Sequence, residues 1–188
     1  MVGKLLKGKL RRNTMFIKET IDTLKSRLEN NKLRLIAPQG EIQTVGFSFN
    51  PPIENKRIQE IEEKYNWYIP KDYRTFLLQH NGAKLYQLYL GETNIGGGLL
   101  LYSLEEALTV QQRLSMNNDY YPIGYVHEHH LMVKNTKYDN KNYLYIGYTD
   151  KEPLNMNFEL FLDRFIVSNG SNFWEWPRLD AEKYYYYF

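Results

Sequence analysis

The chain has 188 residues, a formal net charge of +2 and no cysteine. The length suits one domain with an appended arm, and the lack of cysteine excludes disulfides, thiolate chemistry and cysteine-based zinc sites. Residues 1–12 carry five cations and no acid, which leaves a net charge of −3 on the remainder. Because a nucleic-acid-binding domain carries a basic patch on its folded body, this distribution argues against direct nucleic-acid binding.

The basic leader, residues 1–13, has no continuous apolar core of the length that a secretory signal needs. We expect it to be flexible and solvated. No apolar run in the chain approaches membrane-spanning length. We therefore expect a cytoplasmic protein without membrane contact.

Residues 14–50 are predicted to form an N-terminal extension of one helix and two strands. Apolar residues recur at helical spacing from Thr14 to Asn30. Strands are predicted from Lys32 to Ala37 and from Glu41 to Phe49, where apolar residues alternate with small or polar ones. Two consecutive prolines follow the second strand, and we place the start of the main domain, residues 51–170, at this break.

The main domain opens with two predicted helices separated by a tight break. The first has one apolar face and ends near Tyr65, and the second begins at Pro70, where the missing N–H of proline costs little. We expect this helix to run to His80 and to end at Gly82, which can take the left-handed conformation. The residues of this motif, all given structural roles, are Pro70, Asp72, Tyr73, Phe76, Leu77, Asn81 and Gly82.

Strands interrupted by one helix are predicted next. Strands are expected over Leu85–Leu90 and Leu99–Tyr102. Ser103 and Glu106 have the spacing of a capping box and predict the start of a helix. The Gly96-Gly97-Gly98 run lacks the spacing and helix context of a phosphate-binding loop, so we interpret it as a flexible loop or a close backbone approach.

A meander and a last helix complete the predicted domain. The meander strands are Tyr120–Val126, His130–Val133 and Asn142–Tyr148. We expect the first to lie at a sheet edge or to begin at Pro122, since proline cannot donate to a strand ladder. Asn157 is expected to cap a helix that reaches Phe165, and residues 171–188 form an aromatic tail. This order predicts an α+β fold, a mostly antiparallel sheet flanked by helices.

The two-helix motif resembles the signature of the SUKH superfamily, which is named in part after a yeast cell-wall assembly regulator and is dominated by bacterial immunity proteins. The resemblance covers roughly Pro52 to Phe165 and includes the helix that opens with Ser-Leu-Glu-Glu. It implies a sheet framed by helices, and it implies protection of a cell by toxin binding, without catalysis. Where family members often carry a Gly- and Asp-rich turn, this chain has a histidine-rich one.

The residues His127, Glu128, His129 and His130 are candidates for partner binding, together with Tyr138 and Asp139. If the histidine segment were a strand, His127 and His129 would face one side and could bind a metal together. No recognised metal-site spacing accompanies them, so we expect no metal, no cofactor and no catalytic residue.

Three functional hypotheses follow. The first is an immunity protein that neutralises a polymorphic toxin, such as a nuclease, encoded by a neighbouring gene. In this hypothesis, an acidic body would complement a basic nuclease surface. The alternatives are an intracellular scaffold or signalling module of the same family, and a metal-dependent hydrolase built on the His127–His130 turn. The aromatic tail leaves a homodimer open.

Overall fold

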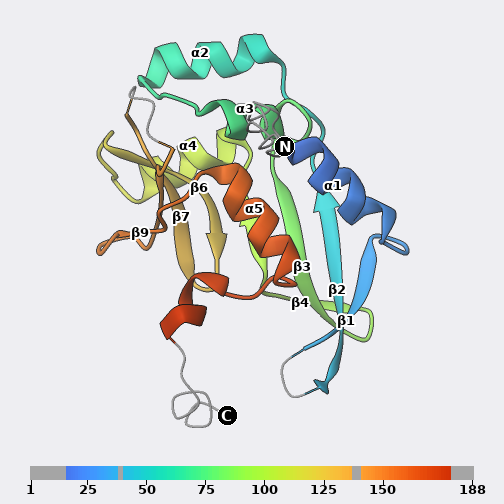
Figure 1. The fold of residues 1–188 in the computed structure, drawn as a ribbon. Helices are drawn as coiled ribbons and strands as arrows, with labels where there is room; N and C mark the ends of the chain where they lie inside the picture. The colour runs from blue at the N-terminus through green and yellow to red at the C-terminus, as the bar shows by residue number, and fades with distance from the viewer. Residues whose placement is uncertain (1–15, 38–39, 137–140, 179–188) are drawn as a thin grey trace, which may run out of the picture.

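The structure, a computed structural model, describes residues 16–37, 40–136 and 141–178. These residues form five α-helices and nine strands of one antiparallel sheet, so the α+β prediction is confirmed (Figure 1). The sheet order is β1-β2-β3-β5-β6-β7-β8-β9, with β4 paired to β3 outside this path. The strands are β1 (Lys32–Ile36), β2 (Ile42–Phe49), β3 (Ala83–Leu90), β4 (Thr93–Gly96), β5 (Leu99–Leu101), β6 (Tyr120–Val126), β7 (His129–Lys134), β8 (Leu144–Ile146) and β9 (Glu152–Pro153). The helices are α1 (Ile17–Ser26), α2 (Asn55–Tyr65), α3 (Lys71–Leu77), α4 (Leu104–Arg113), α5 (Phe158–Val167) and the 3-10 helix η2 (Phe173–Arg178).

Helices α1, α3 and α5 contact one another and cover one face of the sheet, which we call the covered face (Figure 1). The apolar stripe of α1 is buried there, as its helical spacing predicts. From β3, Tyr86 packs its ring against Phe165 of α5, and its hydroxyl donates to the carbonyl oxygen of Ile166 at 2.9 Å. The main apolar core therefore lies between this face and the three helices.

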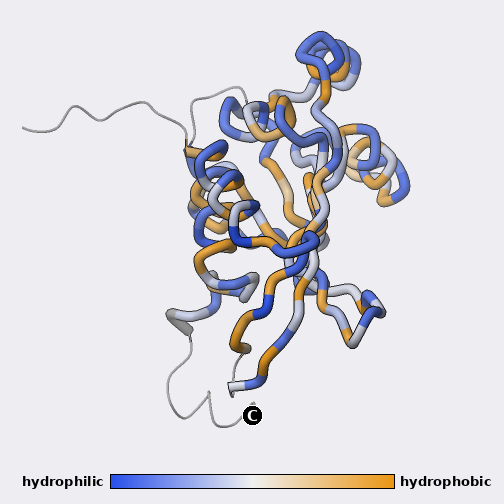
Figure 2. Tube along the Cα trace, turned by 90° about the vertical axis from the view of Figure 1, so that its right-hand side faces the viewer, coloured by the Kyte–Doolittle hydropathy of each residue, from blue (hydrophilic) through white to orange (hydrophobic). Residues whose placement is uncertain are grey.

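Helix α4 lies on the opposite face and packs beside β6. Figure 2 shows the sheet nearly edge-on, with helices on both of its sides. Because α4 has only ten residues, it covers a small part of its face. Ser48 of β2 and Lys84 of β3 remain exposed on this side.

Caps predicted from the sequence start two of the helices. The Ser103 hydroxyl accepts from the Glu106 N–H at 3.1 Å, and the Glu106 carboxylate accepts from the Ser103 N–H at 2.7 Å. The Asn157 side chain accepts from the N–H of Leu160 at 2.9 Å and starts α5. These bonds satisfy N–H groups that have no partner within the helix.

The prediction that the first meander strand lies at a sheet edge or begins at Pro122 is wrong. Strand β6 begins at Tyr120 and lies inside the sheet, between β5 and β7. Proline is tolerated there because β5 ends at Leu101, opposite Gly124, so β5 offers no ladder partner at Pro122. The β6–β7 pairing also shifts register between Pro122 and Gly124, as at a β-bulge.

The second motif helix, α3, is shorter than predicted. It ends at Leu77, with Leu78 as its C-cap, and does not reach His80. The short strands β4 and β9 were not predicted. The close approach at the glycine run is real, because a side chain at Gly98 would overlap the carbonyl oxygens of Leu85 and Tyr86.

The N-terminal extension shares the sheet and core of the main domain. Strand β2 pairs with β3, and α1 packs on α3 and α5. At the other end, η2 buries Phe173 and half-buries Trp174, whereas Trp176 is 52% exposed. The basic leader, residues 1–13, lies outside the described residues, as does the tail after residue 178.

Candidate functional site

The predicted histidine segment is a tight β-hairpin turn between β6 and β7. His127 and Glu128 occupy its two central positions, with φ values of 43° and 66°, and Val126 pairs with His129. Positive φ at both positions is what a two-residue type I′ turn requires. The segment is therefore a turn, and the condition for His127 and His129 to share one side of a strand is not met.

The three histidines of this turn have different surroundings. His127 donates from Nε2 to the carbonyl oxygen of Gly170 at 2.9 Å, and its ring lies 5.8 Å from that of Trp174. His130 packs on the opposite face, between Tyr125 and Tyr148. Over the described ranges, no group of three or more His, Cys, Asp or Glu residues is arranged to hold a metal.

His129 is exposed and lines a small hollow of about 130 Å³ at the end of the hairpin. The hollow is acidic, because three carboxylate residues share its lining with Trp174. They are Asp150, Glu152 and Glu175. Tyr138 and Asp139, also predicted for partner binding, lie outside the described residues.

A row of side chains crosses five strands on the face opposite α1, α3 and α5. Cross-strand pairing joins each member to the next, so all point to the same side of the sheet. Adjacent strands lie about 4.8 Å apart, so the row is about 19 Å long. We call it the central row: Ser48, Lys84, Leu100, Tyr125 and His130.

Aromatic rings gather at one end of the central row. Tyr125 and Tyr148 are 39% and 43% exposed, and their ring centroids lie 5.2 Å and 6.2 Å from that of His130. The hydroxyl of Tyr148 donates to the carbonyl oxygen of Leu114, just after α4, at 2.7 Å. Burial and, to a smaller extent, the positive charge of Arg113 lower the pKa of His130. A neutral imidazole therefore lies between two half-exposed phenols near pH 7.

A second row, nearer the sheet edge, continues this surface. Arg34, Thr44 and Tyr89 pair across β1, β2 and β3 and form the edge row. The ring of Tyr89 packs directly on Gly46, since a Cβ at this position would overlap the ring as it is placed. The ring lies under the ammonium group of Lys32, 4.6 Å from its centroid. We call the edge row and the central row together the open face.

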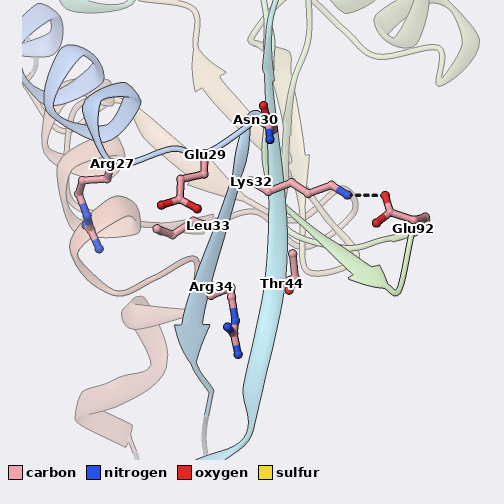
Figure 3. A pocket seen from close by; sticks show the side chains of 8 residues that line it. All are labelled: Arg27, Glu29, Asn30, Lys32, Leu33, Arg34, Thr44 and Glu92. Carbon is pink, nitrogen blue, oxygen red and sulfur yellow. Dashed lines mark hydrogen bonds and ion pairs between the residues drawn. The ribbon is translucent and has the colours of Figure 1, made fainter.

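A surface hollow of about 710 Å³ lies beside β1 at the margin of the open face. Figure 3 shows Lys32 extending across β2 to Glu92 in the β3–β4 turn, where the ion pair measures 2.9 Å. Arg34 and Thr44 line the same hollow. Its chemistry is that of a polar, cation-rich surface, without a converging pair of acids that could perform acid–base catalysis.

The motif residue Asp72 lies in a buried hydrogen-bond network. Its carboxylate accepts from the hydroxyl of Tyr143 at 2.5 Å and from the N–H of Glu159, in the first turn of α5, at 3.1 Å. The Tyr143 hydroxyl in turn accepts from the N–H of Phe158 at 3.0 Å. Burial and the nearby Asp72 carboxylate raise the pKa of Tyr143 well above its ordinary value, so it remains a donor. This network fixes α3 to the start of α5.

The motif's end, Asn81-Gly82, joins α3 to the start of α4. The Asn81 side chain accepts from the N–H of Leu104 at 3.0 Å. Gly82 has φ +99°, and a Cβ there would lie 2.8 Å from the nitrogen of Ser103. Of the other motif residues, Pro70 precedes α3 directly and is buried, and the buried side chains of the helix include Tyr73, Phe76 and Leu77.

Sequence reasoning selected the turn and missed most of the open face. Of the residues predicted for partner binding, only His130 is also a member of the open face. The alternation in Leu85–Leu90 predicts a strand, but Tyr86 has φ 58° and the β2–β3 register shifts beside it. Such a bulge changes which residues share a face, and the sequence pattern does not reveal it.

The comparisons with known proteins agree with this architecture. Residues 52–164 match the SMI1 / KNR4 family (SUKH-1). The chain belongs to this family. It is 40% identical over 185 residues to the "Uncharacterized protein YobM" of Bacillus subtilis (strain 168), covering 92% of this chain and 98% of that protein. It is 30% identical over 137 residues to the "Uncharacterized protein YnaB" of the same organism, covering 69% of this chain and 87% of that protein.

Membership of the SUKH family is typical of toxin-immunity proteins, which are generally not enzymes. The family resemblance stated from the two-helix motif is thus confirmed. Among the described helices, none combines the length and the apolar character that crossing a membrane requires.

Proposed function

We propose that this protein is a cytoplasmic immunity protein that binds a protein toxin and blocks its active surface. The observation that carries the proposal is the family match over residues 52–164. The geometry supports it, because the sheet presents an uncovered face with exposed tyrosines and separate charges. Tyrosine-rich, partly apolar surfaces of this kind favour protein–protein contact.

Neutralisation would be steric. Tyr125 and Tyr148 supply large, half-exposed rings beside His130, at one end of the open face, where desolvation on binding slows dissociation. The charges around them steer the encounter and set the register of the complex. A toxin covered in this way loses access to its substrate without any chemical step.

The prediction that the toxin is a nuclease has less support than the prediction that the partner is a protein toxin. It assumed that an acidic body faces a basic toxin, whereas the open face carries Arg34 and Lys84 as exposed cations. The acidic hollow beside His129 is small. We therefore propose a protein toxin without assigning its chemistry.

The other hypotheses gain little from the structure. The divergent surroundings of His127, His129 and His130 give no support to a metal-dependent hydrolase. The scaffold hypothesis rests on the family alone, and no described feature favours it over toxin binding.

Co-expression tests the proposal. The toxin domain of the secreted protein encoded beside this gene should stop growth when expressed alone, and this chain should restore growth and co-purify with the toxin. An unrelated SUKH protein, expressed at the same level, is the control. No rescue together with no complex would exclude the immunity function.

A further inference from the structure

We infer that the toxin surface docking on the open face carries acidic groups beside an apolar patch. This inference rests on the proposed function and adds the chemistry of the partner. It also reverses the expectation of a basic partner that the acidic overall body suggested. The argument comes from how charges are distributed over one face of the sheet.

The open face carries cations that are free to pair with a partner. Arg34 and Lys84 are both exposed, and neither makes an ion pair with another described residue. They lie on β1 and β3, in the edge row and the central row, respectively. Lys32 adds a third cation, but Glu92 already holds it at 2.9 Å. Two unpaired positive charges thus lie on one flat surface.

The nearest acids do not compensate for these cations. Glu92 is bound to Lys32, and Glu106 caps α4 through the N–H of Ser103. Glu29 lines the same hollow as Arg34, but no ion pair joins the two side chains. A basic partner surface would be repelled here, because like charges brought together across an interface cost several kcal/mol.

Beyond Lys84, toward β5 and β6, the surface becomes apolar and then aromatic. Leu100 pairs directly with both Lys84 and Tyr125, and it is half-buried. Tyr125 exposes ring surface next to it, and Tyr148 does so on the far side of His130. The open face thus has an apolar and aromatic part at one end and exposed cations on β1 and β3. Its complement is a partner surface with an apolar patch beside carboxylates.

The acidic hollow beside His129 is a weaker docking surface. Its volume is about 130 Å³, and Trp174 already lines it. The central row extends about 19 Å across the sheet, which suits the middle of a standard interface of roughly 800 Å² on each partner. We therefore place the partner on the open face.

Charge reversal tests this inference. The test variant combines Arg34→Glu with Lys84→Glu. The matched control combines Lys56→Glu with Lys71→Glu, which makes the same charge change in the first turns of α2 and α3, where acids are favourable. The probe is the purified toxin domain encoded beside the gene, and Kd is measured by calorimetry at 50 and 500 mM sodium chloride. Thermal melts establish that both variants remain folded.

We expect the test variant to bind at least about tenfold more weakly than the original chain at low salt, and the control to stay within about twofold. High salt should weaken binding of the original chain and reduce the difference. A test variant that binds equally well or more tightly overturns the inference and leaves the proposed function intact. Failure of the original chain to bind the toxin would overturn both.

Discussion

The two faces of the sheet differ in what their side chains do. On the covered face, Leu85 and Tyr86 of β3 are buried together with Tyr73 and Phe76 of α3, and Asp72 accepts hydrogen bonds from the Tyr143 hydroxyl and the Glu159 N–H. On the open face, Lys84 and Tyr125 are exposed and contribute little to the core. The same strands therefore supply stability on one side and a contact surface on the other.

This difference separates two kinds of mutational effect. Substitutions on the covered face should lower the free energy of unfolding, because they leave cavities or unpaired buried groups. Substitutions on the open face should change binding and leave unfolding nearly unchanged. Each prediction below tests the effect expected for one of the faces.

Phe76→Ala should give the largest effect. The side chain is fully buried on α3 and packs against Phe158 of α5, with ring centroids 5.2 Å apart. Its truncation leaves a cavity and should reduce the free energy of unfolding by about 3–5 kcal/mol, as measured by urea denaturation. Phe76→Leu, which removes less volume, is the control and should lose clearly less. A loss below about 1 kcal/mol for alanine would contradict the packing described here.

Asp72→Ala should destabilise the protein by about 2–4 kcal/mol, since it leaves the Tyr143 hydroxyl and the Glu159 N–H without their acceptor. Asp72→Asn keeps one acceptor oxygen and should lose about half as much. Urea denaturation checks both. If alanine and asparagine had equal effects, the hydrogen bonds would not be the source of the stability.

Tyr125→Ala should affect binding instead of stability. The ring is 39% exposed, so the free energy of unfolding should change by less than about 1 kcal/mol, while toxin affinity should fall about tenfold or more. Tyr68→Ala removes a tyrosine of similar exposure, 36%, from the segment between α2 and α3 and is the matched control. Equal loss of affinity in both variants would argue against the open face as the binding surface.

His130 should give the smallest effect, a dependence on pH. Its folded-state pKa lies below the ordinary value of 6.5, chiefly because of burial. The unfolded chain then binds more protons than the folded one, so His130 lowers stability as the pH falls below about 6.5. An NMR titration should place its pKa below that value, and His130→Gln should flatten the acid limb of the stability curve. His80, whose pKa is also lowered, is present in the original chain and in the His130→Gln variant. It is titrated in parallel as an internal reference. A pKa for His130 at or above 6.5 would contradict the burial of its ring.

The sequence predicted local structure better than the contact surface. Helical spacing and the caps at Ser103 and Asn157 identified α1, α4 and α5, because these signals lie within one segment. The open face was not predictable in this way. Its members come from separated strands, and their alignment depends on register and on the bulge at Tyr86.

The histidine turn shows a second limit of sequence reasoning. Two-residue hairpins are usually recognised by Asn-Gly or Asp-Gly, whose residues adopt positive φ easily. Here His127 and Glu128 take that conformation, so the usual signal is missing. The sequence therefore predicted a break between strands ending at Val126 and beginning at His130, but not the two-residue turn or the different surroundings of the three histidines.

The central row also has a consequence for how the protein can change over time. Each of its five members sits on a different strand, and none of them anchors the three helices of the opposite face. Single substitutions could therefore change one contact with a partner at a time without changing the fold. Diversification of this surface would demand few compensating substitutions elsewhere, as the proposed toxin-binding function would require.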